Sequence, residues 1–164
     1  MRLRELEPGV EESMATQPDL VLYGRDGRLA VIVDIRNKRG TTAEWAARLR
    51  QNLVAYDAVP AADFFLVATP DRIYLWKDGQ SETFLPPAYE VDARKTLASY
   101  FEKAGLDPEK ISGPAFELLV AAWLSDLVRS RDLSGDAARE QGWLKDSNFL
   151  EVIRNGRIDF PAAA

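Results

Sequence analysis

The chain has 164 residues, no histidine, no cysteine and a formal net charge of −5. These absences exclude Ser-His-Asp and Cys-His hydrolases, imidazole zinc sites and disulfides, so any catalysis must depend on carboxylates, lysine, hydroxyls or a hard metal ion. No apolar run approaches the ~18 residues of a membrane span. Together with the lack of cysteine, this predicts a cytoplasmic protein that contacts no membrane.

Two strands, residues 19–24 and 28–36, are the first elements that the sequence predicts clearly. They are rich in β-branched and aromatic residues and are apolar on both faces, which is typical of strands covered on two sides. Asp26-Gly27 between them favours a two-residue type I′ turn, because that turn needs positive φ at both positions. The pair is therefore predicted to be a hairpin within a layered α/β fold.

A helix and two further strands are predicted next. Residues 40–59 show helical periodicity, with Thr41 or Thr42 as the N-cap. The apolar stripe of this helix would consist of Trp45, Leu49, Leu53 and Tyr56. The following strands are expected over residues 64–69 and 72–77. Because the helix crosses between the second and third strands, those two strands are predicted to be parallel neighbours.

The second half of the chain is predicted to be mainly helical. Helices are expected over residues 93–106, 114–130 and 146–154, and a turn with a short strand over residues 155–160. The predicted fold is α/β, with a mixed β-sheet flanked by helices and a helical C-terminal part. Residues 1–85 would form the core, and residues 86–164 would form an extension packed on it within one compact domain.

The predicted hairpin brings two aspartates together. With a two-residue turn, Asp19 lies directly opposite Asp34, and directly opposed side chains have Cβ atoms ~4.5–5.5 Å apart. Two carboxylates at that separation repel each other unless a cation compensates. Because Mg²⁺ prefers oxygen ligands, it is the predicted cation, and Mn²⁺ is a possible substitute.

Basic residues follow the second aspartate. Arg36 and Lys38 lie two and four positions after Asp34, so an extended strand would place all three on one face. A metal there would polarise a scissile phosphate, and a nearby cation would neutralise developing charge. Arg36, Lys38 and Arg39 are therefore the predicted nucleic-acid contacts. The alternative interpretations are that Asp34 forms an ion pair with Arg36 or with a neighbouring strand, and that Arg36 and Lys38 are the solvated end of the strand.

The same residues resemble a known motif. Pro18-Asp19, a spacer and then Asp34-Ile35-Arg36 are similar to the PD-(D/E)xK motif of the restriction-endonuclease-like superfamily. The likeness covers roughly residues 10–80 and is nearest to the N-terminal nuclease domain of type I restriction motor subunits. It implies a mixed sheet flanked by helices, Mg²⁺-dependent cleavage of DNA, and Asp19 and Asp34 as metal ligands.

The resemblance also implies two further site residues. The family usually has a glutamate on a preceding helix, and Glu11 or Glu12 would supply this metal ligand. The segment from Arg50 to Tyr56 resembles the glutamine-containing helix of the RecB-like branch, which makes Gln51 a candidate catalytic residue.

Arg36 stands where the family has lysine, and Lys38 would replace that lysine. Two functions are therefore considered: a nuclease that hydrolyses DNA, and a catalytically impaired module of the same fold that binds nucleic acid or a protein partner. An exposed part of the helix over residues 113–130 is a third possibility, as a dimer or partner surface. A homodimer or a larger defence or repair complex is the expected assembly.

Overall fold

A computed structural model describes residues 18–55, 62–77, 84–129 and 141–161, and Glu11 and Glu12 lie outside these ranges. The strands are β1 (Leu20–Tyr23), β2 (Leu29–Ile35), β3 (Phe64–Ala68), β4 (Arg72–Trp76), β5 (Tyr89–Asp92) and β6 (Arg157–Asp159). The helices are α2 (Ala43–Ala55), α3 (Ala93–Thr96), α4 (Ala98–Ala104), α5 (Gly113–Arg129), α7 (Gly142–Asp146) and α8 (Phe149–Ile153). Within the described residues, no helix is long and apolar enough to cross a bilayer.

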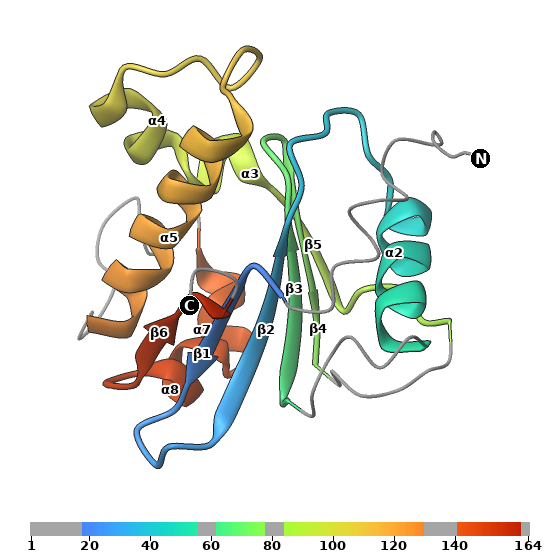
Figure 1. The fold of residues 1–164 in the computed structure, drawn as a ribbon, viewed down its shortest axis with the longest axis vertical. Coiled ribbons are helices and arrows are strands. Elements are labelled where there is room, and N and C mark those ends of the chain that lie inside the picture. The colour runs from blue at the N-terminus through green and yellow to red at the C-terminus, as the bar shows by residue number, and fades with distance from the viewer. Residues whose placement is uncertain (1–17, 56–61, 78–83, 130–140, 162–164) are drawn as a thin grey trace.

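The six strands form one mixed sheet in the order β5-β4-β3-β2-β1-β6 (Figure 1). The central pair, β2 and β3, is parallel, and every other neighbouring pair is antiparallel. The predicted β-β-α-β-β order and the parallel crossover pair are confirmed. The chain is therefore an α/β protein with a six-stranded mixed sheet.

Helices cover both faces of the sheet (Figure 1). Helix α2 packs on one face, while α5, α7 and α8 lie on the other with α3 and α4 near one end. The inner strands β2 and β3 are buried on both faces, as the continuous apolar runs predicted. The result is a three-layer arrangement in which the sheet separates two apolar cores.

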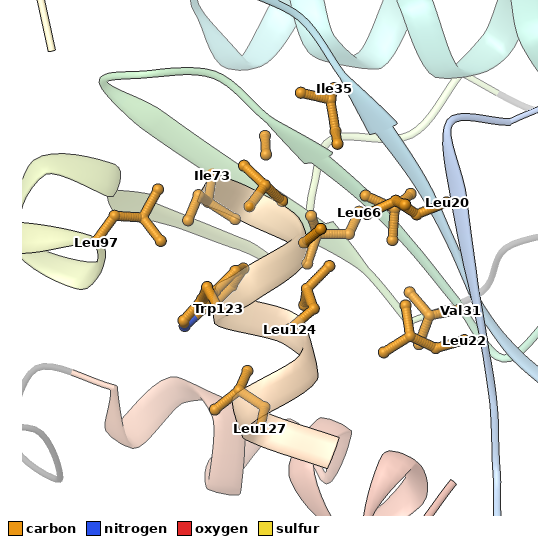
Figure 2. Close-up of a cluster of buried hydrophobic side chains, with 14 of the residues drawn as sticks. Leu20, Leu22, Val31, Ile35, Leu66, Ile73, Leu97, Trp123, Leu124 and Leu127 are labelled. Atoms are coloured by element: carbon orange, nitrogen blue, oxygen red, sulfur yellow. The ribbon is translucent and has the colours of Figure 1, made fainter. Parts of the chain in front are cut away.

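The larger core is centred on α5 (Figure 2). Trp123, which is 1% exposed, lies with Leu124 and Leu127 against the sheet. The sheet side chains in this cluster include Leu20, Leu22, Val31, Leu66 and Ile73. Fully burying each such side chain contributes roughly 1.5–3 kcal/mol. Strands from the first half and helices from the second half therefore share one apolar core.

The sequence located helix α2 correctly and its buried face in part, because Leu53 is buried as predicted while Tyr56 lies outside the described residues. Thr42 is the N-cap, because its Oγ1 accepts the N–H of Trp45 at 3.1 Å. Trp45 and Leu49 are only half-buried. The buried positions are Ala46, Ala47, Arg50, Leu53 and Val54. The small alanines let the helix approach the sheet closely, which leaves Trp45 and Leu49 partly buried at the margin of the contact.

The β1–β2 loop has three residues, 25–27, in place of the predicted two-residue turn. Gly24 N–H donates to Arg28 O at 2.9 Å, and Gly27 N–H donates to Gly24 O at 2.9 Å. Gly27 has a φ of 84°, a left-handed conformation that glycine adopts without the steric cost of a side chain. Asp26 supports the loop by accepting the N–H of Arg28 at 3.0 Å. The prediction of a two-residue turn is therefore wrong.

A bulge restores the predicted register. The pairs on either side of it are Tyr23↔Leu29 and Leu22↔Val31. Ala30 is thus an extra residue on β2, and it offsets the longer loop. Beyond the bulge Leu20 pairs with Val33, as predicted, and Asp19 and Asp34 are the next residues along this register.

The second half contains one strand, β5, and one helix, α7, that were not predicted, and one predicted helix that is interrupted. Strand β5 lies at the sheet edge and is only partly buried, so it lacks the apolar pattern of the inner strands. The predicted helix over residues 93–106 divides into α3 and α4 at Leu97. Asn148, with a φ of 71°, separates α7 from α8. Strand β6 forms where a short terminal strand was predicted.

Gly156 leads into β6 at a point where two backbones nearly touch. A Cβ at this position would lie 1.8 Å from the carbonyl oxygen of Tyr23. Only a residue without a side chain fits such an approach. Gly156 thereby lets β6 pair with β1, with Tyr23 facing Arg157.

Candidate active site

The two aspartates of the predicted site lie where the parallel strand β2 ends. Asp34 is the penultimate residue of β2 and pairs with Val67 on β3. Asp19 occupies the bend immediately before β1. The carboxyl ends of parallel strands are where open α/β sheets usually bind ligands. The register therefore brings both carboxylates to the end of the sheet where ligands usually bind.

Asp19 is held in place by the backbone of the opposite strand. Its Oδ2 accepts the N–H of Ile35 at 2.7 Å. Burial and the nearby Asp34 charge raise the pKa of Asp19 from 3.8 to about 6, although the Ile35 hydrogen bond acts in the opposite direction. A carboxylate with this pKa responds to protons and cations near neutral pH.

Asp34 is nearly buried and carries an ion pair. It is 7% exposed, and its Oδ2 accepts from Nε of Arg36 at 2.7 Å. A buried carboxylate needs such a partner, because an unpaired charge is costly in an apolar environment. The alternative interpretation of an ion pair between these two residues is confirmed. Arg36 also lowers the pKa of Asp19, so one guanidinium acts on both carboxylates.

Lys38 does not lie on a strand. Strand β2 ends at Ile35, and only one further backbone hydrogen bond, from Arg36 N–H to Ala68 O at 3.0 Å, continues the ladder. The alternation that would have aligned Lys38 with Asp34 stops before it reaches that residue. Its side chain is exposed, and its roles in catalysis and nucleic-acid binding stay predictions.

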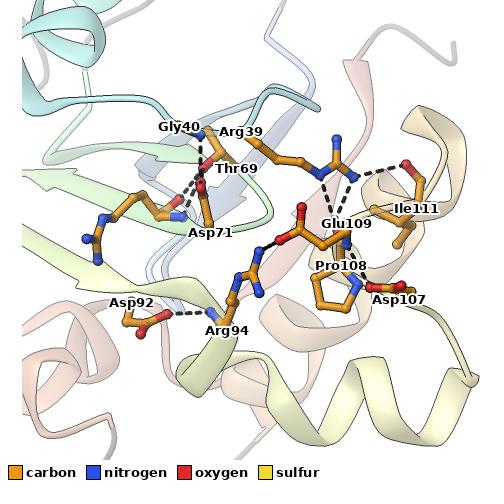
Figure 3. Close-up of polar contacts among 11 residues, drawn as sticks. Arg39, Gly40, Thr69, Asp71, Asp92, Arg94, Asp107, Pro108, Glu109 and Ile111 are labelled. Carbon is orange, nitrogen blue, oxygen red and sulfur yellow. Dashed lines mark hydrogen bonds and ion pairs between the residues drawn. The ribbon is translucent and has the colours of Figure 1, made fainter.

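Arg39 makes contacts that the sequence did not predict (Figure 3). Its Nε and Nη2 donate to the carbonyl oxygen of Pro108 at 2.9 and 2.7 Å, and Nη2 also approaches Ile111 O at 3.4 Å. Asn37 donates to the same Ile111 carbonyl at 3.0 Å. The loop after β2 is thereby fastened to the connection between α4 and α5. A nucleic-acid role for Arg39 stays a prediction.

Further polar contacts brace this region (Figure 3). Asp71, in the β3–β4 turn, accepts the N–H of Gly40 at 2.9 Å. Arg94 forms an ion pair with Glu109 in the α4–α5 connection. Asp92 accepts the N–H of Arg94 at 2.9 Å and caps α3. The loop that follows Asp34 is thus tied to both the sheet and the helical layer.

Arg39→Ala tests this bracing. We expect the free energy of unfolding to fall by about 1–3 kcal/mol, because charge-assisted hydrogen bonds to two carbonyl groups are lost. Lys38→Ala removes the neighbouring exposed charge and is expected to stay within about 0.5 kcal/mol of the wild type. Urea denaturation measures both variants, and equal stabilities would contradict the structural role of Arg39.

The remaining predicted site residues are Gln51 and Glu11. Gln51 is half-buried on α2, the helix that covers one face of the sheet, and its catalytic role stays a prediction. Glu11 precedes the described residues, so its role as a metal ligand also stays a prediction. Within the part of the chain that the structure describes, no three carboxylates gather closely enough to hold a metal ion. Asp19 and Asp34 are therefore a pair of candidate ligands there.

Glu117 is a neighbour that the sequence did not point to. This exposed residue on α5 contributes to the raised pKa of Asp19. Asp19 and Glu117 both line a cavity of about 310 Å³. They are almost one hundred positions apart, and only the packing of α5 on the sheet brings them together. The signal in the sequence that could have identified Glu117 was an acidic residue within a largely apolar predicted helix.

The described geometry defines an α/β protein with two facing carboxylates and an arginine at one edge of a mixed sheet. Comparison of the chain with family models, curated proteins and solved structures gives no match. A function must therefore be argued from these residues and their chemistry.

Proposed function

We propose that the chain has a restriction-endonuclease-like fold and hydrolyses phosphodiester bonds of DNA with Mg²⁺ or Mn²⁺. The observation that carries this proposal is the coupled pair Asp19 and Asp34 at the end of β2. Their position after Pro18 and before Ile35-Arg36 agrees with the order of the PD-(D/E)xK motif. The parallel β2–β3 pair with its crossover helix is consistent with that fold.

The donor chemistry suits a hard cation. Asp19 and Asp34 offer carboxylate oxygens, which Mg²⁺ and Mn²⁺ prefer, and together they would hold the ion. With a pKa of about 6, Asp19 is mostly ionised at pH 7 to 8, as metal binding requires. When bound, the ion would polarise the phosphodiester and lower the pKa of a water molecule.

The residues of the chain have separate tasks in this proposal. The Ile35 N–H fixes the orientation of the Asp19 carboxylate through its 2.7 Å hydrogen bond. Arg36 stays protonated throughout, so it serves as a fixed positive charge that can attract a phosphate oxygen. Its ion pair with Asp34 holds that charge at the site. The exposed Lys38 would contact the DNA backbone outside the site.

The second candidate function is a catalytically impaired module of this fold that binds nucleic acid or a protein partner. The 2.7 Å ion pair between Arg36 and Asp34 supports it, because the guanidinium already neutralises one of the two metal ligands. Arginine also cannot release a proton to help activate water, unlike a lysine whose pKa is lowered. In both functions the proposed setting is the cytoplasm, within a homodimer or a larger defence or repair complex.

Metal binding is tested by thermal denaturation in a series of Mg²⁺ and Mn²⁺ concentrations. We expect the wild-type melting temperature to rise, because a ligand at one hundred times its Kd stabilises the folded state by about 2.7 kcal/mol. Asp34→Asn should abolish this rise. Glu102→Gln, a change at an exposed position of α4, should leave it intact. If neither metal raises the melting temperature of the wild-type protein, the nuclease proposal is contradicted.

Cleavage is tested by plasmid nicking with Mn²⁺. We expect Asp19→Ala to abolish nicking, and Arg36→Lys to increase it at least about tenfold, because lysine can position water and share its proton. Nicking by Arg36→Lys alone, with an inactive wild type, would establish the impaired module. An inactive Arg36→Lys variant that still binds the metal would contradict a nuclease site at these residues.

A further inference from the structure

Exposed apolar side chains gather beside one cavity. Leu118 on α5 is 71% exposed, and Phe160, just after β6, is 43% exposed. Both line the cavity of about 310 Å³ that also touches Asp19 and Glu117. Its other lining residues are Leu20, Ile35 and Pro114. Exposed apolar groups that converge on a hollow indicate an interaction surface, whereas scattered ones need no explanation.

The charges around this cavity indicate the chemistry of its partner. Among the described residues that line it, Asp19 and Glu117 are acidic and none is basic. Asp159, beside Phe160, adds a further exposed carboxylate. Arg36 is a base that lowers the pKa of Asp19, and its guanidinium is held by Asp34. Without a cation bound at Asp19, a nucleic-acid backbone would be repelled here, whereas a cationic side chain would be attracted.

We propose that this cavity is the docking site for a peptide segment of a partner protein, in which an apolar side chain is flanked by lysine or arginine. The apolar side chain enters between Leu118 and Phe160, and the basic side chain lies against Glu117. The volume is at the lower end of the range for ligand pockets, so it suits a single anchor residue. The proposal holds whether or not the protein is a nuclease, and its test leaves Asp19 unchanged.

The test is fluorescence anisotropy with the full chain and a fluorescein-labelled peptide of alternating leucine and lysine. We expect saturable binding that weakens as salt rises, and no binding of the matching leucine–glutamate peptide. Leu118→Ser and Glu117→Lys should each weaken binding at least about tenfold. Both positions are exposed, and circular dichroism would verify that the variants remain folded.

Two matched controls separate this site from general effects. Glu102→Lys makes the same charge change on α4, and Phe84→Ser removes another exposed large apolar side chain, which is 42% exposed. Both should bind the leucine–lysine peptide as the wild type does. Absence of saturable binding, or equal weakening by a control variant, would overturn the proposal.

Two other occupants of the cavity would also overturn it. A dimer in sedimentation velocity that Leu118→Ser converts to monomer would assign the surface to a second copy of the chain. Binding of a single-stranded oligonucleotide that depends on Leu118 would assign it to nucleic acid. A monomer whose oligonucleotide binding is unchanged by Leu118→Ser agrees with the peptide site.

Discussion

Replacing Asp19 by asparagine is expected to stabilise the metal-free protein by about 2–3 kcal/mol at pH 8. The folded state raises the pKa of this carboxyl from 3.8 to about 6, chiefly through burial and the Asp34 charge. Asparagine carries no charge to bury, yet its side-chain oxygen can still accept the N–H of Ile35. The variant therefore keeps the hydrogen bond and loses the electrostatic penalty.

The pH dependence follows from the sign of this shift. Between pH 3.8 and about 6 the folded state retains the Asp19 proton more strongly than the unfolded chain does. The stabilising contribution of the Asp19 proton to the folded wild type is therefore fully present below pH 3.8. It is lost as the pH rises to about 6, and above that pH the stability no longer changes through this group. The difference between Asp19→Asn and the wild type should grow over that interval.

Urea denaturation at several pH values measures the effect. Glu102→Gln, which removes an exposed carboxylate on α4, serves as the control and should give a small, pH-independent difference. A wild-type protein more stable than Asp19→Asn at pH 8 would show that the ionised carboxylate is favoured in the folded state. If Mg²⁺ binds at Asp19 and Asp34 as proposed, only the wild type gains stability from the ion, and Mg²⁺ at one hundred times its Kd should offset the difference by about 2.7 kcal/mol. A residue that weakens the fold for the benefit of a site is a common cost of function.

The second large effect is expected from Gly156→Ala. The new Cβ would lie 1.8 Å from the Tyr23 carbonyl oxygen and 2.9 Å from its carbonyl carbon. Both atoms belong to the backbone of β1, so no side-chain rotation relieves the clash. We expect the free energy of unfolding to fall by about 3 kcal/mol, because β6 must move away from its partner strand.

Gly142→Ala is the matched control, since a Cβ there has no neighbour within 4 Å. It lies at the first position of α7 and should change stability by less than about 1 kcal/mol. Limited trypsin digestion reports the local effect, because loosening of β6 would speed cleavage after the exposed Arg157. Similar stabilities of the two alanine variants would contradict the close approach of Gly156.

The inner strands could be predicted because their sequences alone carry the pattern. Residues 64–68 are apolar throughout and residues 29–35 are apolar apart from Asp34, and the helix between them requires a crossover. The facing of Asp19 and Asp34 was obtained from an incorrect turn, since the bulge at Ala30 offsets the longer loop. A one-residue bulge cannot be recognised in a strand that is buried on both faces, because its sequence has no polar–apolar alternation to interrupt.

The remaining features depend on contacts between distant residues. Strand β5 is only partly buried, and its edge position follows from pairing with β4. Arg39 reaches Pro108, and Glu117 approaches Asp19, only once α5 has packed on the sheet. No local propensity encodes these contacts, so the sequence supplied the acid pair but not its surroundings.

The hairpin has a consequence for recognising similar sites in other sequences. Asp19 and Asp34 would face each other with a two-residue turn and unbroken strands, and they do so with a three-residue loop and the Ala30 bulge. The number of residues between the two acids is the same in both cases. A search for facing carboxylates should therefore fix the spacing between them and leave the turn sequence unrestricted. One uncompensated insertion would place Asp19 opposite a neighbour of Asp34, which separates the pair without altering either motif residue.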